Sequence, residues 1–282
     1  MTCQHCSVIP SYILQDIAEN SNVQTPCRRT YTKALNREIY DAHQKSYDEL
    51  PGVLVFGGAS SRSLNDESVK NVHGHFQKIF DFYQKVFNRN SFDGKGAKLI
   101  ISVHFDGDPN PGYDNVFWYP NPDPKLSQWG FGDGDFVLFD NFTKILDISA
   151  HEFTHAVVEY TGILPYWYQS GALNESISDV FGSMIKQFFA PGGPQKAKDA
   201  DWLVGEGLFL VPGGRALRDM ENPGTAYDIP GVTKDRQPAA GTPYVELPPW
   251  TDNGGVHIYS SIPNRAFVLV AKALGGFSWE IA

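Results

Sequence analysis

The residues best suited to chemistry are two histidines and a glutamate in the segment HEFTH at residues 151–155, which has the pattern H-E-x-x-H. Residues four apart on an α-helix leave it on nearly the same side, so the imidazoles of His151 and His155 can bind one metal ion. Glu152 lies about 100° around the helix, where its carboxylate can reach a water on that metal without binding the metal itself. Chance would produce this pattern about 0.01 times in such a chain. The pattern predicts a zinc site.

A third protein ligand is expected, because a catalytic zinc keeps its fourth position open for water or substrate. Glu175 is the candidate, and 19 residues (156 through 174) separate it from His155. Asp179 lies one helical turn further and can accept a hydrogen bond from a ligating imidazole. A Glu-x-x-x-Asp pair is usually a solvated helix face. At this distance after H-E-x-x-H, it predicts the other half of the metal site.

A further cluster follows at residues 252–257, with the sequence DNGGVH. A single histidine is more often structural than catalytic. Here His257 follows a Gly-Gly turn, and Asp252, five residues earlier, can orient its ring. The segment is therefore a second candidate for the site.

The elements that must position these residues follow from the spacing of apolar side chains. Apolar residues at three- and four-residue steps predict helices, and a short apolar run such as KLIISVHF predicts a buried strand. The helix around HEFTH is largely apolar, which argues against a merely solvated polar face. The predicted helices are 68–88, 145–160, 172–189 and 256–274, and the predicted strands are 98–105 and 136–139. Strands precede helices, so we expect an α+β fold of two lobes with the HEFTH helix between them.

Composition excludes several classes of protein. The 282 residues carry 23 Lys and Arg against 32 Asp and Glu, a net charge of −9, which argues against nucleic acid or an anionic membrane as partner. No apolar run approaches the roughly 18–20 residues of a membrane span. The N-terminus has no basic segment of the kind that begins a signal peptide. Three cysteines are too few for a disulfide scaffold and suit a reducing compartment, so a cytoplasmic location stays open.

The segments HEFTH, GALNESISD and DNGGVHIYSSIPNRA resemble, in order and spacing, the signature segments of the thermolysin family of neutral zinc metalloproteases. The resemblance covers roughly residues 50–282. It implies a zincin-type fold with a β-rich lobe over 46–165, which includes the zinc helix, and a helical lobe over 166–282. Relatives continue with more helices, so the second lobe is expected to be truncated. The family is mostly exported, and a secreted monomer acting on peptides and proteins is expected.

The N-terminal segment CQHCSVIPSYIL and the segment REIYDA (residues 37–42) resemble the prosegment of the protealysin-like branch of this family. The resemblance implies a prosegment over residues 1–45 that self-cleavage would release, with the cut within residues 36–52. The thiols of Cys3, Cys6 and Cys27 have two open interpretations. They are incidental reduced thiols, which we favour, or they form a small metal site or cap on the zinc.

The resemblance also implies roles for individual residues. His151, His155 and Glu175 would bind zinc, Glu152 would be the general base, and Asp179 would support His151. The remaining implied residues are Tyr166 and His257 for the oxyanion, Asp252 to orient His257, Asn115 and the Val116 carbonyl for the substrate backbone, Arg218 for a substrate carbonyl, and Phe139, Phe142, Ile148, Val204 and Leu217 for an apolar pocket. Such a pocket should favour Leu, Phe or Ile directly after the scissile bond.

Calcium is a point where the chain departs from the family pattern. Asp147, Asp201 and Glu206 match positions of the family's paired calcium site, but Lys186 and Leu203 stand where carboxylates are expected. Because a lysine ammonium can replace one cation electrostatically, we expect no double calcium site.

Two other functions remain as alternatives. A zinc aminopeptidase usually has 18 residues between the second histidine and the glutamate, whereas this chain has 19, and it needs a G-x-M-E-N motif that is absent. A non-enzymatic alternative is an inactive or self-inhibited fragment that acts only as a binding protein.

Overall fold

The structure is a computed structural model that describes residues 35–281 apart from 58–63, 108–112, 122 and 124. Residues Leu35–Ala282 form one compact unit. The three cysteines and most of the expected prosegment lie outside the described residues, so the two interpretations of Cys3, Cys6 and Cys27 remain as they were.

The N-terminal lobe is built on a five-stranded sheet with the strand order β2-β1-β3-β5-β4. The strands are β1 (Arg37–Asp41), β2 (Val53–Phe56), β3 (Leu99–Phe105), β4 (Val116–Tyr119) and β5 (Gln128–Gly132). Neighbours β1, β3 and β5 run parallel, whereas β2 and β4 pair antiparallel at the two ends of the sheet. The strand predicted at 98–105 is confirmed as β3, which lies inside the sheet and is almost wholly buried.

Strand β1 lies within the range that the sequence assigned to the prosegment. It pairs with β2 on one side and with β3 on the other, and Ile39 at its centre is fully buried in the main core. Residues 37–41 are therefore part of the sheet in this chain.

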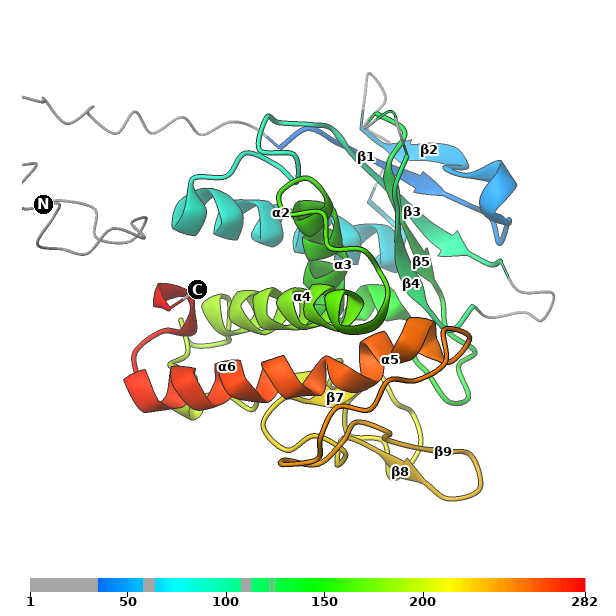
Figure 1. Cartoon of the computed structure of the whole chain (residues 1–282). Coiled ribbons are helices and arrows are strands. Elements are labelled where there is room, and N and C mark those ends of the chain that lie inside the picture. Colours follow the sequence, from blue (N-terminus) through cyan, green and yellow to red (C-terminus); the bar gives the residue numbers. More distant parts are fainter. Residues whose placement is uncertain (1–34, 58–63, 108–112, 122, 124, 282) are drawn as a thin grey trace, which may run out of the picture. The chain divides into compact units, whose positions relative to one another are not determined.

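Helices α2 (Glu67–Phe87) and α3 (Leu146–Glu159) lie on one side of the sheet (Figure 1). The Asp66 carboxylate caps α2 by accepting a hydrogen bond from the backbone N–H of Val69 at 2.9 Å. Between the layers, the ring of Trp129 from β5 stacks on that of Phe153 from α3, with 5.6 Å between the ring centroids. Helix α3, which carries the HEFTH segment, is thus held against the sheet by large aromatic side chains.

The predicted strand at 136–139 is wrong. The Asp135 carboxylate accepts hydrogen bonds from the backbone N–H groups of Val137, Leu138 and Phe139, which folds the segment into a turn. Phe136 has a left-handed backbone (φ 54°), and Phe139 forms only an isolated bridge to Phe209. The apolar run was correct, but the aspartate before it offered the backbone an alternative to strand pairing.

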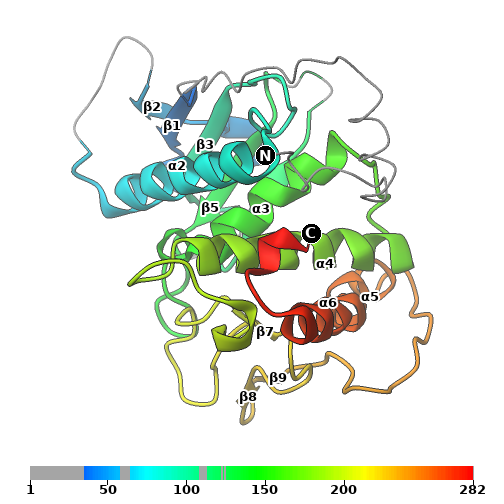
Figure 2. The ribbon, with the colours of Figure 1, turned by 90° about the vertical axis from the view of Figure 1, so that its left-hand side faces the viewer.

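The C-terminal lobe is helical, as predicted. It contains α4 (Tyr168–Phe188), α5 (Asp252–Tyr259) and α6 (Ser261–Leu274). Figure 2 shows α4 crossing below α3, and the close approach depends on Gly182, where a Cβ would lie 2.7 Å from the Asp147 carbonyl oxygen. The helix predicted at 256–274 is interrupted at Ser260, and Pro263 falls in the first turn of α6, where its missing N–H costs nothing.

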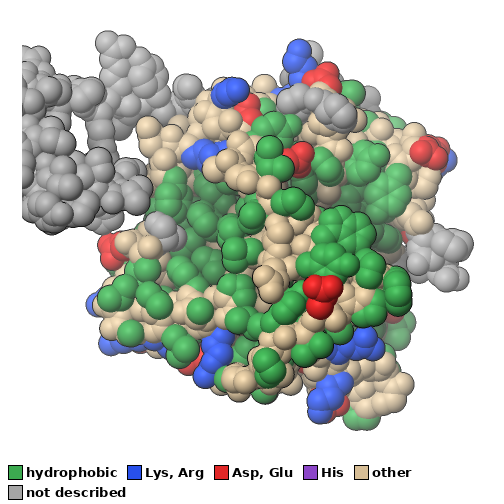
Figure 3. All heavy atoms as spheres, viewed as in Figure 1, with side chains coloured by type: hydrophobic (Ala, Val, Ile, Leu, Met, Phe, Trp, Pro, Cys, Tyr) green, Lys and Arg blue, Asp and Glu red, His purple; other side chains and the backbone are tan. Residues whose placement is uncertain are grey.

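Short elements complete the described structure. The two-residue strands are β6 (Leu203–Val204), β7 (Arg218–Asp219), β8 (Asp228–Ile229) and β9 (Thr233–Lys234), and the 3-10 helices are η1 (Tyr47–Glu49), η2 (Phe142–Lys144), η3 (Ala197–Asp199) and η4 (Ser278–Glu280). Leu269, Val270 and Leu274 of α6 are exposed. Figure 3 shows hydrophobic side chains on the face of the molecule that carries α6. Among the described residues, no helix has the length and apolar character needed to cross a membrane.

Candidate metal centre

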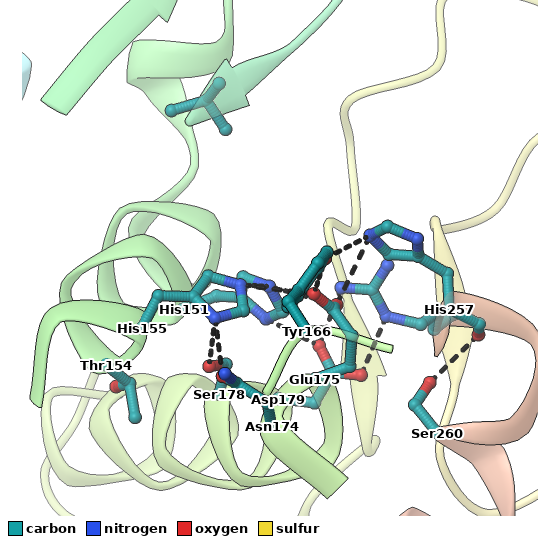
Figure 4. A network of polar contacts seen from close by, with 12 residues as sticks. His151, Thr154, His155, Tyr166, Asn174, Glu175, Ser178, Asp179, His257 and Ser260 are labelled. Atoms are coloured by element: carbon teal, nitrogen blue, oxygen red, sulfur yellow. Dashed lines mark hydrogen bonds and ion pairs between the residues drawn. The ribbon is translucent and has the colours of Figure 1, made fainter. Parts of the chain in front are cut away.

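Three side chains from two helices converge on one point between α3 and α4 (Figure 4). The Nε2 atoms of His151 and His155 are 2.9 Å apart. The Glu175 carboxylate approaches both, with its oxygens 3.4 Å from His151 Nε2 and 3.2 Å from His155 Nε2. The i, i+4 spacing on α3 aligns the imidazoles, and the tight α3–α4 packing brings the carboxylate to them.

The outer nitrogens of both imidazoles are held by residues of α4. His151 Nδ1 donates to Asp179 Oδ1 at 2.8 Å, and His155 Nδ1 donates to the Asn174 side-chain oxygen at 2.8 Å. Ser178 Oγ also lies 3.1 Å from His155 Nδ1. These contacts direct both Nε2 atoms to the shared point. The Asp179 contact agrees with the sequence prediction, whereas Asn174 and Ser178 were missed, although they lie one residue before and three residues after Glu175 on α4.

Asp179 is itself held by two further residues. Arg218 donates to both of its carboxylate oxygens at 2.7 Å, and Asn264 from α6 donates to Oδ2 at 2.8 Å. Burial raises the pKa of Asp179, but Arg218 and His151 lower it more, to about 2. Asp179 therefore stays ionised and keeps His151 oriented. Sequence reasoning gave no role to Asn264, which lies 85 positions away, although it falls within the segment DNGGVHIYSSIPNRA that carries the family resemblance.

The donor set of this cluster fits a zinc ion. Glu175 Oε2 is fully buried, and among the described residues it accepts no hydrogen bond. A buried carboxylate oxygen without a donor is unfavourable unless a cation completes its surroundings. Two imidazole nitrogens and one carboxylate oxygen, with room for a fourth ligand, are the protein ligands of a catalytic zinc site.

Glu152 lies beside this group and is almost completely buried. Burial raises the pKa of its carboxyl, while the imidazoles of His155 and His151 lower it, and the net direction is upward. The backbone N–H of Trp118 in β4 also bonds to this carboxylate. An upward shift makes Glu152 a stronger base than an exposed glutamate.

Tyr166 and His257 face the metal group from the opposite side (Figure 4). The Tyr166 hydroxyl donates to Glu175 and lies 3.2 Å from His257 Nε2. The Asp252 carboxylate accepts from His257 Nδ1 at 2.5 Å and from the His257 backbone N–H at 2.8 Å. The structure therefore brings together all three residues that the sequence assigned to this part of the site.

The turn that brings Asp252 back to His257 requires glycine. Asn253, Gly254 and Gly255 all have left-handed backbone angles, with φ of 49°, 85° and 90°. At Gly254 a Cβ would also lie 2.4 Å from the Tyr168 ring. The DNGG sequence is thus the local cause of the His257 position.

A cleft of about 520 Å³ opens over the metal group. Asn115 and Val116 line it, and Val116 begins β4, the last strand in the order of the sheet. Asn115 Oδ1 accepts a hydrogen bond from the Val116 backbone N–H at 2.9 Å, and the Asn115 side chain also bonds to Tyr113. The cleft is lined by Asn115, Val116, Phe117, Trp118, Pro120, His151, Glu152, His155, Glu159, Ile163, Leu164, Tyr166, Asn174, Glu175 and His257.

The five residues expected to form an apolar pocket lie in two places, the wall of a cavity and the buried core beneath it. Phe139 and Leu217 line a second cavity of about 510 Å³, together with Arg218, Asp252 and His257. Phe142, Ile148 and Val204 are buried in the main core. Leu217 and Ile148 approach each other at Gly205, where a Cβ would meet both side chains.

The residues compared with a calcium site surround a lysine. Lys186 Nζ lies 3.0 Å from Asp201, 3.3 Å from Glu206 and 3.7 Å from Asp147, all measured to carboxylate oxygens. It also donates to the Leu203 backbone carbonyl at 3.2 Å. Burial raises the pKa of Asp147 to about 6, and Lys186 opposes that shift. An ammonium in this position does not fit a paired calcium site, because like charges within a few ångströms repel.

The fold and the metal group define a two-lobed zinc metalloendopeptidase, with a β-sheet lobe, a helical lobe and two histidines of H-E-x-x-H beside a downstream glutamate. Residues 12–159 match the family model described as the thermolysin metallopeptidase catalytic domain, and residues 163–282 match that of the thermolysin metallopeptidase alpha-helical domain. The chain belongs to the thermolysin family of metallopeptidases, within its protealysin branch.

The most informative relatives are bacterial proteases. "Protease PrtS" of Photorhabdus sp. is 41% identical over 285 residues, covering 100% of this chain and 71% of that protein. An "Extracellular metalloprotease" of Pectobacterium carotovorum is 42% identical over 302 residues, covering 98% of this chain and 82% of the relative. The solved precursor of protealysin from Serratia proteamaculans is 41% identical, with a TM-score of 0.78 over 97% of this chain and 82% of that one.

Proposed function

We propose that this chain cleaves peptide bonds with Glu152 as general base and with His151, His155 and Glu175 as the zinc ligands. The observation that carries this proposal is the convergence of these three ligands beside Glu152, with one buried Glu175 oxygen left without a donor among the described residues. These residues would hold a zinc ion, which would supply Lewis-acid polarisation of the scissile carbonyl and acidification of water.

Side chains of the protein then transfer the proton and stabilise the negative charge that develops on the substrate. Glu152 takes a proton from the attacking water and passes it to the leaving amine. Tyr166 and protonated His257 donate hydrogen bonds to the oxyanion that develops on the carbonyl oxygen. Burial lowers the pKa of His257, but Glu175 and Asp252 raise it more, which favours the protonated imidazole that such a role needs.

Substrate would bind along β4 as an added strand. Val116 supplies a backbone carbonyl at the end of the sheet, and the Asn115 amide can donate to the substrate backbone. Arg218, which pairs with Asp179, also lines the second cavity, and this supports the proposal that it binds a substrate carbonyl. The same cavity presents Phe139 and Leu217, which supports a preference for Leu, Phe or Ile directly after the scissile bond.

We further propose that Lys186 replaces the cation at the position of the family's paired calcium site. Asp147, Asp201 and Glu206 then need no calcium for charge balance. A calcium-independent fold with a zinc-dependent activity is the expected combination.

The prosegment boundary is proposed to lie close to Ala34 rather than at residue 45. Removal of residues to 45 would delete β1, an interior strand with a fully buried Ile39. A secreted location is proposed from relatives that are named extracellular.

A chelator assay tests the zinc mechanism. Casein cleavage should be lost with 1,10-phenanthroline and return when zinc is added back, because the zinc supplies the Lewis acid. Cleavage of free N-terminal residues alone would favour the aminopeptidase alternative. Casein binding without cleavage in the zinc-loaded protein would favour the binding-protein alternative.

A further inference from the structure

The cleft contains one carboxylate that the proposed mechanism does not use. Glu159 lies four residues after His155, so the two side chains leave α3 on the same side, one turn apart. It lines the cleft and is only partly buried. Among the described residues that line this cleft there is no lysine or arginine. Glu152 and Glu175 belong to the metal group, which leaves Glu159 as a charge directed to substrate.

Trp118 holds Glu159 in place. Its indole Nε1 donates to Glu159 Oε2 at 2.7 Å. No described lysine or arginine forms an ion pair with this carboxylate, although ion pairs are found elsewhere on the surface, for example between Lys45 and Glu49. An oriented carboxylate without a cationic partner is well suited to receive a cation from a ligand.

The walls around Glu159 suit the stem of a long basic side chain. Ile163 and Leu164 line the same cleft, and Ile163 is 75% exposed. Pro120 and the Trp118 ring add apolar surface. Lysine and arginine combine an apolar stem with a charged end, and this end of the cleft offers an apolar wall that leads to a carboxylate.

The position of Glu159 along α3 indicates which part of a substrate it meets. Ile148 lies on the turn before His151, near Leu217 and the cavity proposed for the residue after the scissile bond. Glu159 lies on the turn after His155, at the other end of the ligand-bearing stretch. A chain laid along β4 would therefore bring its residues before the scissile bond to Glu159.

We propose that Glu159 selects a lysine or arginine in the part of the substrate that precedes the scissile bond. This inference rests on the proposed function and deepens it by naming a substrate class. A partly exposed ion pair of this kind corresponds to a preference of about three- to tenfold in kcat/KM.

The test uses peptides that differ by one charge. A quenched fluorescent series has leucine after the scissile bond and either lysine or acetyl-lysine at the first, second or third position before it, since acetylation removes the charge and keeps the stem. We expect lysine to be preferred about three- to tenfold at one position, and the ratio to fall towards one in Glu159→Gln and at high salt. Glutamine keeps an oxygen for the Trp118 indole.

The exposed Glu67, the first residue of α2, provides the matched control. Glu67→Gln removes the same charge outside the cleft and should keep the wild-type ratio. No preference at any of the three positions in the wild type, or an unchanged preference in Glu159→Gln, would overturn the inference.

A binding measurement separates this inference from the proposed function. In the Glu152→Gln background, fluorescence anisotropy should show tighter binding of the lysine peptide, and the added Glu159→Gln change should abolish the difference. If the wild type cleaves no peptide but this binding difference is present, the proposed function fails and the inference stands. Equal binding of both peptides in the Glu152→Gln background contradicts the inference whatever the activity.

Discussion

Two clusters of carboxylates lie at the α3–α4 interface, and their negative charge is balanced in different ways. Asp147 and His151 lie one turn apart on α3, but Asp147 faces the ammonium of Lys186, whereas His151 faces Glu175. In the first cluster the chain supplies its own cation. In the second, a Glu175 oxygen is left without a donor among the described residues. The second cluster can therefore take an ion from outside, and this is where the chemistry is expected.

The largest effect should come from the base beside the cluster that needs a metal. Glu152→Gln removes the proton acceptor but none of the three ligands, so kcat should fall by about 10³-fold or more while zinc stays bound. Peptide turnover and metal content measured on the same sample provide the check. Near-normal turnover with bound zinc would remove Glu152 as the base.

The next effect concerns the cluster with an internal cation. Lys186→Met leaves the buried Asp147 without its ammonium, and we expect the free energy of unfolding to fall by about 2–3 kcal/mol. This figure is below that for a fully buried pair because Asp201 and Glu206 are 42% and 50% exposed. Urea unfolding of zinc-loaded samples measures the loss.

Two controls sharpen the Lys186 measurement. Lys144→Met breaks the more exposed pair with Asp140 and should cost less than about 1 kcal/mol. Calcium should stabilise Lys186→Met and leave the wild type unchanged, because only the variant has an uncompensated group of carboxylates. Stabilisation of the wild type by calcium would show that the lysine does not replace the ion.

The smallest effect is expected at His104, a histidine whose positive charge depends on pH. His104 lies 2.8 Å from Asp133 and 3.3 Å from Asp66, and its hydrogen bond to Asp133 raises its pKa from 6.5 to about 9 despite partial burial. Because the folded-state pKa is the higher one, its stabilising effect is full below pH 6.5 and is lost as pH rises through 9.

His104→Gln should therefore lower the free energy of unfolding by about 1 kcal/mol more at pH 6 than at pH 9.5. Urea titrations of both proteins at the two pH values measure this difference. A difference between variant and wild type that does not change with pH would mean that the imidazole is not charged in the folded protein.

Much of the metal site could be predicted because helical periodicity is local. Residues i and i+4 share a helix face in any tertiary context, so the pairing of His151 with His155 follows from five consecutive residues. Spacing predicted that Asp179 would accept from a ligating imidazole, and the family resemblance implied that this imidazole is His151. Asn174 and Asn264 escaped prediction because their contacts depend on the angle and register between helices.

The errors have equally specific causes. Residues 136–139 have the apolar character of a strand, but the Asp135 carboxylate captures their backbone N–H groups. Strand β1 lies in the range compared with a prosegment and was not predicted as a strand, and its pairing with β2 and β3 makes it part of the sheet. Strand pairing joins distant segments, so no local pattern reports it.

By itself the sequence determined which functional groups are available for chemistry. These are two imidazoles and a carboxylate on one helix, a second carboxylate on the next helix, and His257 after a Gly-Gly turn. Residue type and short-range geometry are sufficient for that. The tertiary structure determined which charged side chains lie close enough to form ion pairs. It placed Lys186 among Asp147, Asp201 and Glu206 and left the Glu175 oxygen without a donor among the described residues. Charge compensation depends on distances across the packed core, and these arise only when α3 and α4 come together.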